Sequence, residues 1–430
     1  MSWFVLLALA IALLLILLFL GVRVFIGFLI LNLVGVLWLI GPRGFGLFAN
    51  SLYETATSPS LMTVALFVLM GEILFRSGTV DVLFDSVDRL IGNLRGRLYA
   101  VVIGLSTVFG ALSGSAVAVA AMLGRSVLPL MQRRGYDTRI SASTILAGAS
   151  LAPIIPPSLV AIIVGSLADV SIAGLLVAGL LPGMLLAALT LGYVYLRIVG
   201  TKTDDKPAKR TGSAGRALLR MAPFLVVVFA VMGLIILGIA TPSESAATGV
   251  LGALVVAALF GRLNPAMLRA AVASAATTAT VILIIVASAK LFSQLLSFSG
   301  ATRGLVSTVN LLDLGPDLTF LIMMLIPFFL CMFIDWLAFM LLAIPIYQPI
   351  VKAMEFDPIW FWALFMINLT VGSMTPPFGY TLFALKGANP DLSTRDVFMS
   401  AWPVVGIFLV GMVCLWAMPG LVTTLPDLLQ

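Results

Sequence analysis

The 430-residue sequence has no histidine, only two cysteines and few charged residues. Without histidine the chain lacks the usual proton shuttle, the commonest metal ligand and the base of most hydrolytic triads. Cys331 and Cys414 lie within apolar runs, and we interpret them as small buried hydrophobic residues, since no CxxC or zinc-type spacing is present. These absences argue against a zinc enzyme and against a histidine-dependent hydrolase.

Charge is scarce and apolar residues dominate. Charged residues make up 10% of the chain and hydrophobic residues 61%, and the mean hydropathy is +1.18. Because soluble domains carry about 25% charged residues, this composition predicts an all-α polytopic membrane protein embedded in a lipid bilayer. The alternating ten-residue segments of an outer-membrane barrel are absent. The net charge of +6 comes largely from short loops, so it indicates topology rather than nucleic-acid binding.

Loop charge predicts how the chain crosses the bilayer. Two basic loops, 76–97 and 125–139, flank the single apolar run 98–124. Basic loops stay in the cytoplasm, so one crossing between them conflicts with the positive-inside rule. A re-entrant hairpin that opens to the cytoplasm removes the conflict. The apolar run 318–350 is expected to form a second hairpin that opens outward, and both termini are expected outside.

The first residues, up to about position 20, lack the basic start and cleavage site of a signal peptide and are expected to remain as a first span. A charged stretch at 80–98 is expected to lie as a helix on the inner membrane surface. The polar loop RIVGTKTDDKPAKRTGSAGRALLR carries seven basic residues and is the natural boundary between two halves. The predicted regions are N-terminal scaffold spans (1–97), a first repeat unit (98–199), a basic cytoplasmic linker (200–220), central scaffold spans (221–300) and a second repeat unit (301–430).

Two Pro-Pro pairs, at 156–157 and 376–377, interrupt apolar runs. Proline removes a backbone donor and clashes with the preceding turn, so each pair is expected to break a helix. Lipid cannot satisfy the freed backbone groups. Ser113 precedes the first pair by 43 residues and Asp335 precedes the second by 41, in units of opposite topological sense. This pattern predicts an inverted repeat with a binding site at the bilayer midplane, although kinked spanning helices are the alternative.

Several segments occur in an order that resembles a known family. They are SGSAVAVAAMLGRSVLPLMQRRGY, GASLAPIIPPSLVAIIVGS, TPSESAA, FIDWLAFMLLAIPIYQPI and NLTVGSMTPPFGYTLFALKG. Together, over essentially the whole chain, they resemble the large membrane subunit of tripartite ATP-independent periplasmic (TRAP) transporters of the C4-dicarboxylate and sialic acid type. The resemblance implies the ion-transporter superfamily fold, with an elevator-type transport domain held by a scaffold.

The resemblance also implies function and partners. It implies Na⁺-coupled secondary uptake of a small organic anion across a bacterial inner membrane, with Na⁺ as coupling ion and no other cofactor. It implies two protein partners, a small four-helix membrane subunit and a periplasmic substrate-binding protein. Ala116 stands where many relatives have another serine, which affects the expected ligand set.

The family places its sodium sites near the hairpin tips and the broken helices. Freed carbonyls and hydroxyls at such places suit a hard cation, and helix N-termini attract anions. We therefore predict two Na⁺ sites together with the substrate site. The first involves Ser113, Gly114, Ser115, Ser150 and the Pro156-Pro157 break, and the second involves Asn368, Gly372, Thr375 and the Pro376-Pro377 break. Close helix packing by small residues is the alternative explanation for the serines.

Asp335 is also a candidate because an acid inside an apolar run is costly and usually functional. It can face a water-filled cavity, bind a cation, or cap a helix. Glu72 is expected to pair with Arg76 one turn later, and Glu244 is expected to cap a helix start.

Three other functions compete with the leading hypothesis. A self-sufficient Na⁺/dicarboxylate symporter or anion antiporter would work without a binding protein. An intramembrane enzyme is disfavoured, because a rhomboid-like protease is expected to need histidine and prenyl transfer is expected to need acidic clusters. A purely structural scaffold would tolerate mutation of both hairpins.

Overall fold

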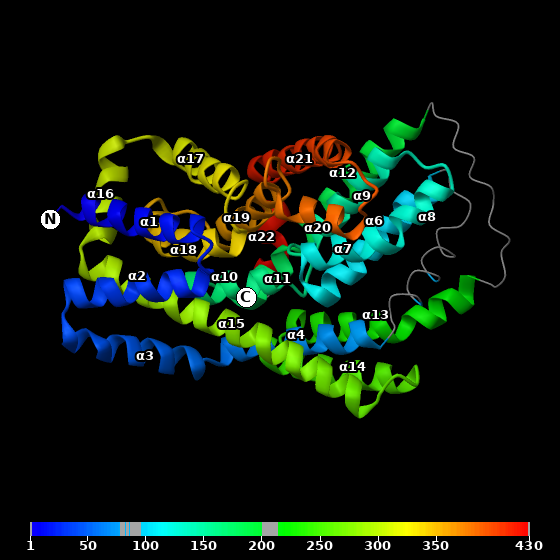
Figure 1. The fold of residues 1–430 in the computed structure, drawn as a ribbon, viewed down its shortest axis with the longest axis horizontal. Coiled ribbons are helices and arrows are strands. Elements are labelled where there is room, and N and C mark those ends of the chain that lie inside the picture. Colours follow the sequence, from blue (N-terminus) through cyan, green and yellow to red (C-terminus); the bar gives the residue numbers. More distant parts are fainter. Residues whose placement is uncertain (1, 78–81, 83–85, 87–95, 200–213, 429–430) are drawn as a thin grey trace.

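The computed structural model describes residues 2–77, 82, 86, 96–199 and 214–428 (Figure 1). Over these residues it is helical and contains no β-strand. Six of the described helices are long and apolar enough to cross a membrane, and the segments Pro42–Ala56 and Leu61–Arg76, bent by 47°, would together make a seventh. The predicted all-α membrane fold is thereby confirmed. Most of the expected surface helix and the first part of the basic linker lie outside the described residues.

One group of helices comes from the N-terminal and central regions and from the first residues of the region expected as the second repeat unit. Helix α4 packs against α14 and α15, while α2 and α3 pack against α15. The bounds are α1 (Trp3–Phe19), α2 (Val24–Leu39), a 3₁₀ turn η1 (Pro42–Gly44), α3 (Phe45–Ala56), α4 (Pro59–Arg76), α13 (Ala214–Ile236), α14 (Pro242–Leu259), α15 (Pro265–Phe298) and α16 (Ala301–Leu312). We call this group the scaffold helices. The sequence analysis did not predict α3 or α16 as separate helices.

The first repeat unit starts with a helical pair and continues with a broken helix. Its bounds are α6 (Arg97–Ser113), α7 (Ala116–Ser126), α8 (Leu128–Arg133), α9 (Thr138–Leu151), α10 (Leu159–Ala168), α11 (Ile172–Ala178) and α12 (Leu180–Ile198). The break between α9 and α10 contains the first Pro-Pro pair, as the sequence predicted.

The second repeat unit also begins with a helical pair and continues with a broken helix, but it has no counterpart of α8 among the described helices. Its bounds are α17 (Gly315–Leu330), α18 (Trp336–Ala353), α19 (Pro358–Ser373), α20 (Tyr380–Ala388), α21 (Thr394–Ala417) and α22 (Gly420–Asp427). The second Pro-Pro pair lies between α19 and α20, and in both pairs the Pro-Pro peptide bond is cis.

Three structural features of the first unit recur in the second unit at a constant distance along the chain. The matched residues are Ser115 with Asp335, Asp137 with Asp357, and Pro156 with Pro376. The differences 335 − 115, 357 − 137 and 376 − 156 are all 220. In the first match each residue N-caps the second helix of a pair, and in the second each aspartate N-caps the helix that leads into a break. The two units therefore use the same kind of local structure, an N-capped helix or a Pro-Pro break, at these three positions.

The two units interlock. Helix α7 of the first unit packs against α20 of the second, and α10 of the first packs against α18 of the second. Helices α9 and α21 also lie side by side, as Figure 1 shows near the top of the view. In each unit, the second helix of the pair packs against the broken helix of the other unit. This arrangement brings both breaks together in the interior.

A glycine fixes the position of the first break. An ideal Cβ on Gly179, between α11 and α12, would stand 2.1 Å from the carbonyl oxygen of Ile154, which lies in the break. Only a residue without a side chain allows this approach, because the obstructing atom belongs to the backbone.

We expect Gly179→Ala to lower the free energy of unfolding by about 1–3 kcal/mol, the usual cost of overpacking. The control is Gly192→Ala on α12, where an added Cβ meets nothing within 4 Å. There alanine is expected to be neutral or slightly stabilising, since it favours a helix over glycine by about 1 kcal/mol. Thermal unfolding in detergent, followed by tryptophan fluorescence, measures both. Equal melting temperatures for Gly179→Ala and the parent chain would contradict the close approach.

Candidate functional site at the junction of the two repeat units

The tip between α6 and α7 lies against the first broken helix. Helix α6 ends at Ser113, whose side chain falls outside the described part of the structure, and Gly114 then takes a positive φ of 61°. Ser115 N-caps α7, where its hydroxyl accepts a hydrogen bond from the Ala118 N–H at 3.3 Å. A Cβ on Gly114 would stand 3.0 Å from Leu159 Cγ at the start of α10. Gly114 in this tip therefore lies next to the start of α10, directly after the first break.

The first break meets the second through a buried serine. Ser158 caps α10 and donates to the carbonyl oxygen of Pro153 inside the break. Ser150, the next-to-last residue of α9, is fully buried. Its Oγ lies 3.1 Å from the Sδ of Met374 in the second break. The hydroxyls at the first break thus bind the backbone and the opposite break.

Two predicted residues, Gly372 and Thr375, lie at the second break, whereas the side chain of Asn368 binds α17. Thr375 is buried, and its Oγ1 donates to the Val371 carbonyl at 2.6 Å. Gly372 allows close packing, because an added Cβ would lie 2.5 Å from the Cβ of Cys331 after α17. Asn368 donates from Nδ2 to the Met324 carbonyl of α17. Its side-chain nitrogen is therefore bound to α17, away from the Thr375 hydroxyl.

Asp335 acts as the N-cap of α18. Its Oδ1 accepts hydrogen bonds from the N–H groups of Leu337 at 3.0 Å and Ala338 at 3.2 Å. This geometry is the capping arrangement expected as one interpretation. The rings of Phe333 in the α17–α18 tip and Phe378 in the second break lie 5.9 Å apart and join the tip to the break. The cation-ligand roles expected from the sequence stay predictions.

A small cavity lies where the tips and broken helices of both units meet. Its volume is about 30 Å³, which is comparable to the volume of one water molecule. Its lining is Ser115, Ala116, Val117, Pro153, Val160, Trp336, Met366, Leu369, Thr370, Ser373 and Thr381. We call it the junction cavity. Among the residues that the structure describes, none hydrogen-bonds the Thr381 hydroxyl, so this hydroxyl is available to a guest.

Three hydroxyl residues of the junction cavity escaped the sequence analysis. Thr370 and Ser373 lie one turn apart on α19, and Thr381 is the second residue of α20. Hydroxyl residues one helical turn apart before the Pro-Pro pair, and another shortly after it, were the sequence pattern that could have indicated them.

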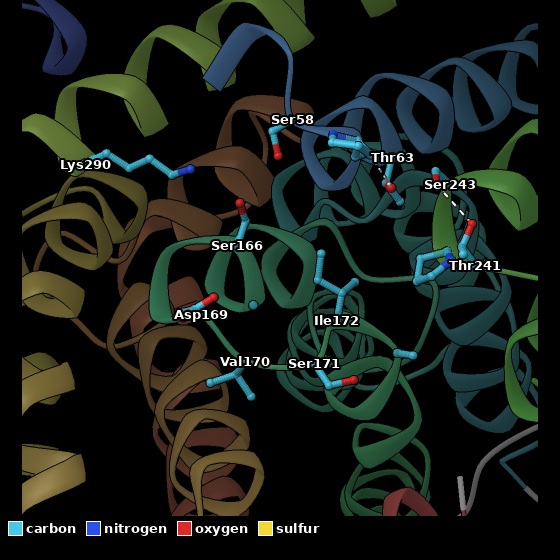
Figure 2. A pocket seen from close by; sticks show the side chains of 14 residues that line it. Ser58, Thr63, Ser166, Asp169, Val170, Ser171, Ile172, Thr241, Ser243 and Lys290 are labelled. Atoms are coloured by element: carbon cyan, nitrogen blue, oxygen red, sulfur yellow. Dashed lines mark hydrogen bonds between the residues drawn. The ribbon is translucent and has the colours of Figure 1, made fainter. Parts of the chain in front are cut away.

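A larger cavity of about 490 Å³ lies between the scaffold helices and the first unit (Figure 2). It is lined by Ser58, Pro59, Thr63, Gly165, Ser166, Asp169, Val170, Ser171, Ile172, Ala173, Thr241, Pro242, Ser243 and Lys290. We call it the lateral cavity. Lys290 on α15 extends into it in Figure 2. Sequence analysis also missed Lys290, whose signal was a single lysine within a long apolar run.

Two other acidic residues behave as expected. Glu72 lies 2.8 Å from the Nε of Arg76. It also accepts a hydrogen bond from Ser274 of α15. Glu244 forms a capping box with Thr241 at the start of α14. Both residues therefore have structural partners.

Comparison with known proteins gives a consistent result. Residues 11–421 match the model of the family described as "Tripartite ATP-independent periplasmic transporter, DctM component". The chain is 28% identical to an ectoine/5-hydroxyectoine TRAP transporter large permease protein of Ruegeria pomeroyi, over 75% of this chain and 76% of that protein. It is 30% identical to the 2,3-diketo-L-gulonate TRAP transporter large permease protein of Escherichia coli, over 81% and 83%.

A solved structure resembles the fold. The crystal structure of the Alcanivorax borkumensis YdaH transporter superimposes with a TM-score of 0.64, covering 89% of this chain and 90% of that one, at 15% identity. This likeness concerns the fold alone.

We expect Asp335→Ala to destabilise the chain by about 0.5–2 kcal/mol, because the first turn of α18 loses its cap. Asp335→Asn and Asp335→Ser retain a capping oxygen and are expected to lose much less, as Ser115 fills the matching position in the first unit. Melting temperatures of the purified variants in detergent test this. If Asp335→Asn were as unstable as Asp335→Ala, the negative charge rather than the cap would be the stabilising feature.

Proposed function

The chain belongs to the DctM family of tripartite ATP-independent periplasmic transporters, and from this premise we propose that it is the large permease subunit of a Na⁺-coupled uptake system for a small organic anion. The observation that carries the Na⁺ proposal is the junction cavity, because both tips and both broken helices contribute to it. Membrane transporters with inverted repeats bind coupling ions at such discontinuous helices.

The chemistry of the junction cavity favours a hard monovalent cation. A volume of about 30 Å³ is too small for an organic acid but accepts a single ion. Neutral hydroxyls of Ser115, Thr370 and Ser373 surround it, and freed carbonyls lie in the neighbouring breaks. Oxygen ligands of this kind suit hard cations. The Thr381 hydroxyl can serve as a further ligand.

The proposed mechanism is movement of the two repeat units against the scaffold helices. The units interlock with one another through α7, α20, α10 and α18. Their contacts with the scaffold are made mainly by α6 and α10 with α4 and by α18 with α15 and α16. Such an interface can slide as a unit, which is the elevator movement that the family resemblance implies.

The proposed setting is a bacterial inner membrane, with both termini on the outer side. The proposed partners are a small four-helix membrane subunit and a periplasmic binding protein that delivers the anion. Loops 169–171 and 237–241, beside the lateral cavity, carry no Lys or Arg. The positive-inside rule therefore predicts that this cavity lies towards the side of delivery. A self-sufficient symporter, which would work without a binding protein, is the second candidate.

We expect uptake in liposomes to require three things: the small membrane subunit, the binding protein and an inward Na⁺ gradient. The measurement is accumulation of labelled candidate carboxylates with and without each component. Uptake by this chain alone would instead establish the self-sufficient carrier. Uptake that needs the binding protein but ignores Na⁺ would remove the cation assignment.

We expect Thr381→Val to raise the Na⁺ concentration for half-maximal uptake by roughly tenfold to a hundredfold, since a hydrogen-bonding group to a charge contributes about 1.5–3 kcal/mol. Valine keeps the shape of threonine and removes only the hydroxyl. The control is Thr190→Val on α12, whose hydroxyl donates to the Leu186 carbonyl of its own helix. An unchanged Na⁺ dependence in Thr381→Val, with the protein still folded, would exclude this hydroxyl as a ligand.

A further inference from the structure

We propose that the lateral cavity is a binding site for a small monocarboxylate that also carries a hydrogen-bond-donating or cationic group. Lys290 holds the carboxylate, and Asp169 accepts from the other end of the molecule. The inference rests on the proposed transport function and adds to it the class of substrate and the residues that select it. A dicarboxylate is the ligand class that this site disfavours.

The first argument is the position of Lys290. It lies eight residues before the end of α15, a 34-residue apolar helix, where an ionisable side chain marks a functional site by default. Figure 2 shows its side chain extended into the lateral cavity, towards Ser58 and Ser166. No residue in the described part of the chain forms an ion pair or hydrogen bond with its ammonium group. A buried or half-buried cation without a partner is stabilised by an anion.

The second argument is the set of donors around that ammonium group. The hydroxyls of Ser58 and Ser166 line the same cavity, and the described residues offer neither of them a hydrogen-bond partner. Ser58 is the N-cap of α4, it makes no side-chain cap bond, and the first turn of α4 holds no acidic residue. The partial positive charge at this helix start is therefore not neutralised by its own helix. Ammonium, two hydroxyls and a helix start together favour a carboxylate.

The third argument is a negative charge at the end of α10, in the lining of the same cavity. Asp169 ends α10 with a positive φ of 56° and lines the cavity beside Ser166. An ionised carboxylate only accepts hydrogen bonds. A hydroxyl, ammonium or amidinium group of the ligand satisfies it, whereas a second ligand carboxylate would be repelled. Lys290 is the only cationic side chain among the residues that line this cavity.

The fourth argument is size. A volume of about 490 Å³ falls within the range of roughly 300–1,000 Å³ that is usual for small-molecule sites. The junction cavity is far too small for the same ligand. The walls also come from two parts of the molecule, Lys290 and Ser58 from the scaffold helices, Ser166 and Asp169 from the first unit. A ligand here therefore bridges the parts that the proposed elevator moves.

The test uses the full chain with its small membrane subunit in liposomes. Cys331→Ala and Cys414→Ala remove the native thiols, and Ser166→Cys places a reporter in the cavity. The rate of labelling is measured with an anionic sulfonate and a cationic trimethylammonium methanethiosulfonate. Asp169 also lies near position 166, so the informative quantity is the change in the ratio of anionic to cationic labelling. We expect Lys290→Met to lower this ratio roughly threefold to tenfold, because it removes the nearby ammonium group, and we expect Lys290→Arg to keep the parent ratio.

Protection of Ser166→Cys against labelling by added compounds identifies the ligand class. Gluconate, a hydroxylated monocarboxylate, and ectoine, a zwitterionic one, are expected to slow labelling at concentrations where succinate does not. Lys290→Met should remove this protection, and Asp169→Asn should weaken protection by ectoine while allowing protection by succinate. The matched control is Lys352→Met, an exposed lysine in the last turn of α18. It should change neither the labelling ratio nor the protection.

Two results would overturn the inference: a labelling ratio and protection that Lys290→Met leaves unchanged, or protection by succinate equal to that by gluconate in the parent chain. Monodisperse elution of each variant, with Lys290→Arg as the folded reference, excludes misfolding as the cause of a loss. Labelling does not require turnover, so protection without Na⁺-driven uptake would refute the proposed function and leave the site. Uptake without protection would refute the site and leave the function.

Discussion

The fold depends on one constraint, the need to satisfy backbone groups wherever a helix breaks inside a membrane. Each Pro-Pro pair frees N–H and C=O groups that lipid cannot bond. In the first break the Pro153 carbonyl accepts from the Ser158 hydroxyl, and in the second the Val371 carbonyl accepts from Thr375. The remaining N–H and C=O groups must find their hydrogen-bond partners inside the protein. Both breaks therefore lie between the interlocked units, and the buried contact of Ser150 with Met374 joins them.

The two repeat units share an N-capped helix start at their tips, but the capping residues differ in charge. Ser115 and Asp335 occupy the same position, and each accepts hydrogen bonds from the first turn of the following helix. A hydroxyl and a carboxylate both cap a helix, so folding tolerates either. They differ in charge, however, and only the second tip carries an acid. The two halves of the junction are thus alike in shape and unlike in electrostatics.

Sequence reasoning found the features that are local in the chain. The apolar runs and the two Pro-Pro breaks follow from periodicity and from the chemistry of proline, and the structure has helices and breaks at those places. The tip spacing was two residues off, because the residue that matches Asp335 is Ser115 rather than Ser113. What escaped was set by packing between distant segments. The direction of Asn368 depends on how closely α17 approaches at Gly372. Thr381 and Lys290 became candidates only once α19, α20, α10 and α15 were placed around cavities. The spacing of residues along one segment does not show which distant segments line a cavity with it.

The two cavities are connected by a single helix. Val160, near the start of α10, lines the junction cavity, and Ser166, near its end, lines the lateral cavity. Six residues of α-helix separate them, about 9 Å along the axis. The start of α10 is held by the Ser158 cap and by the tip at Gly114, both within reach of the junction. Because α10 runs from one cavity to the other, we expect a shift of its start at the junction cavity to displace Ser166 and Asp169 at the lateral cavity as well.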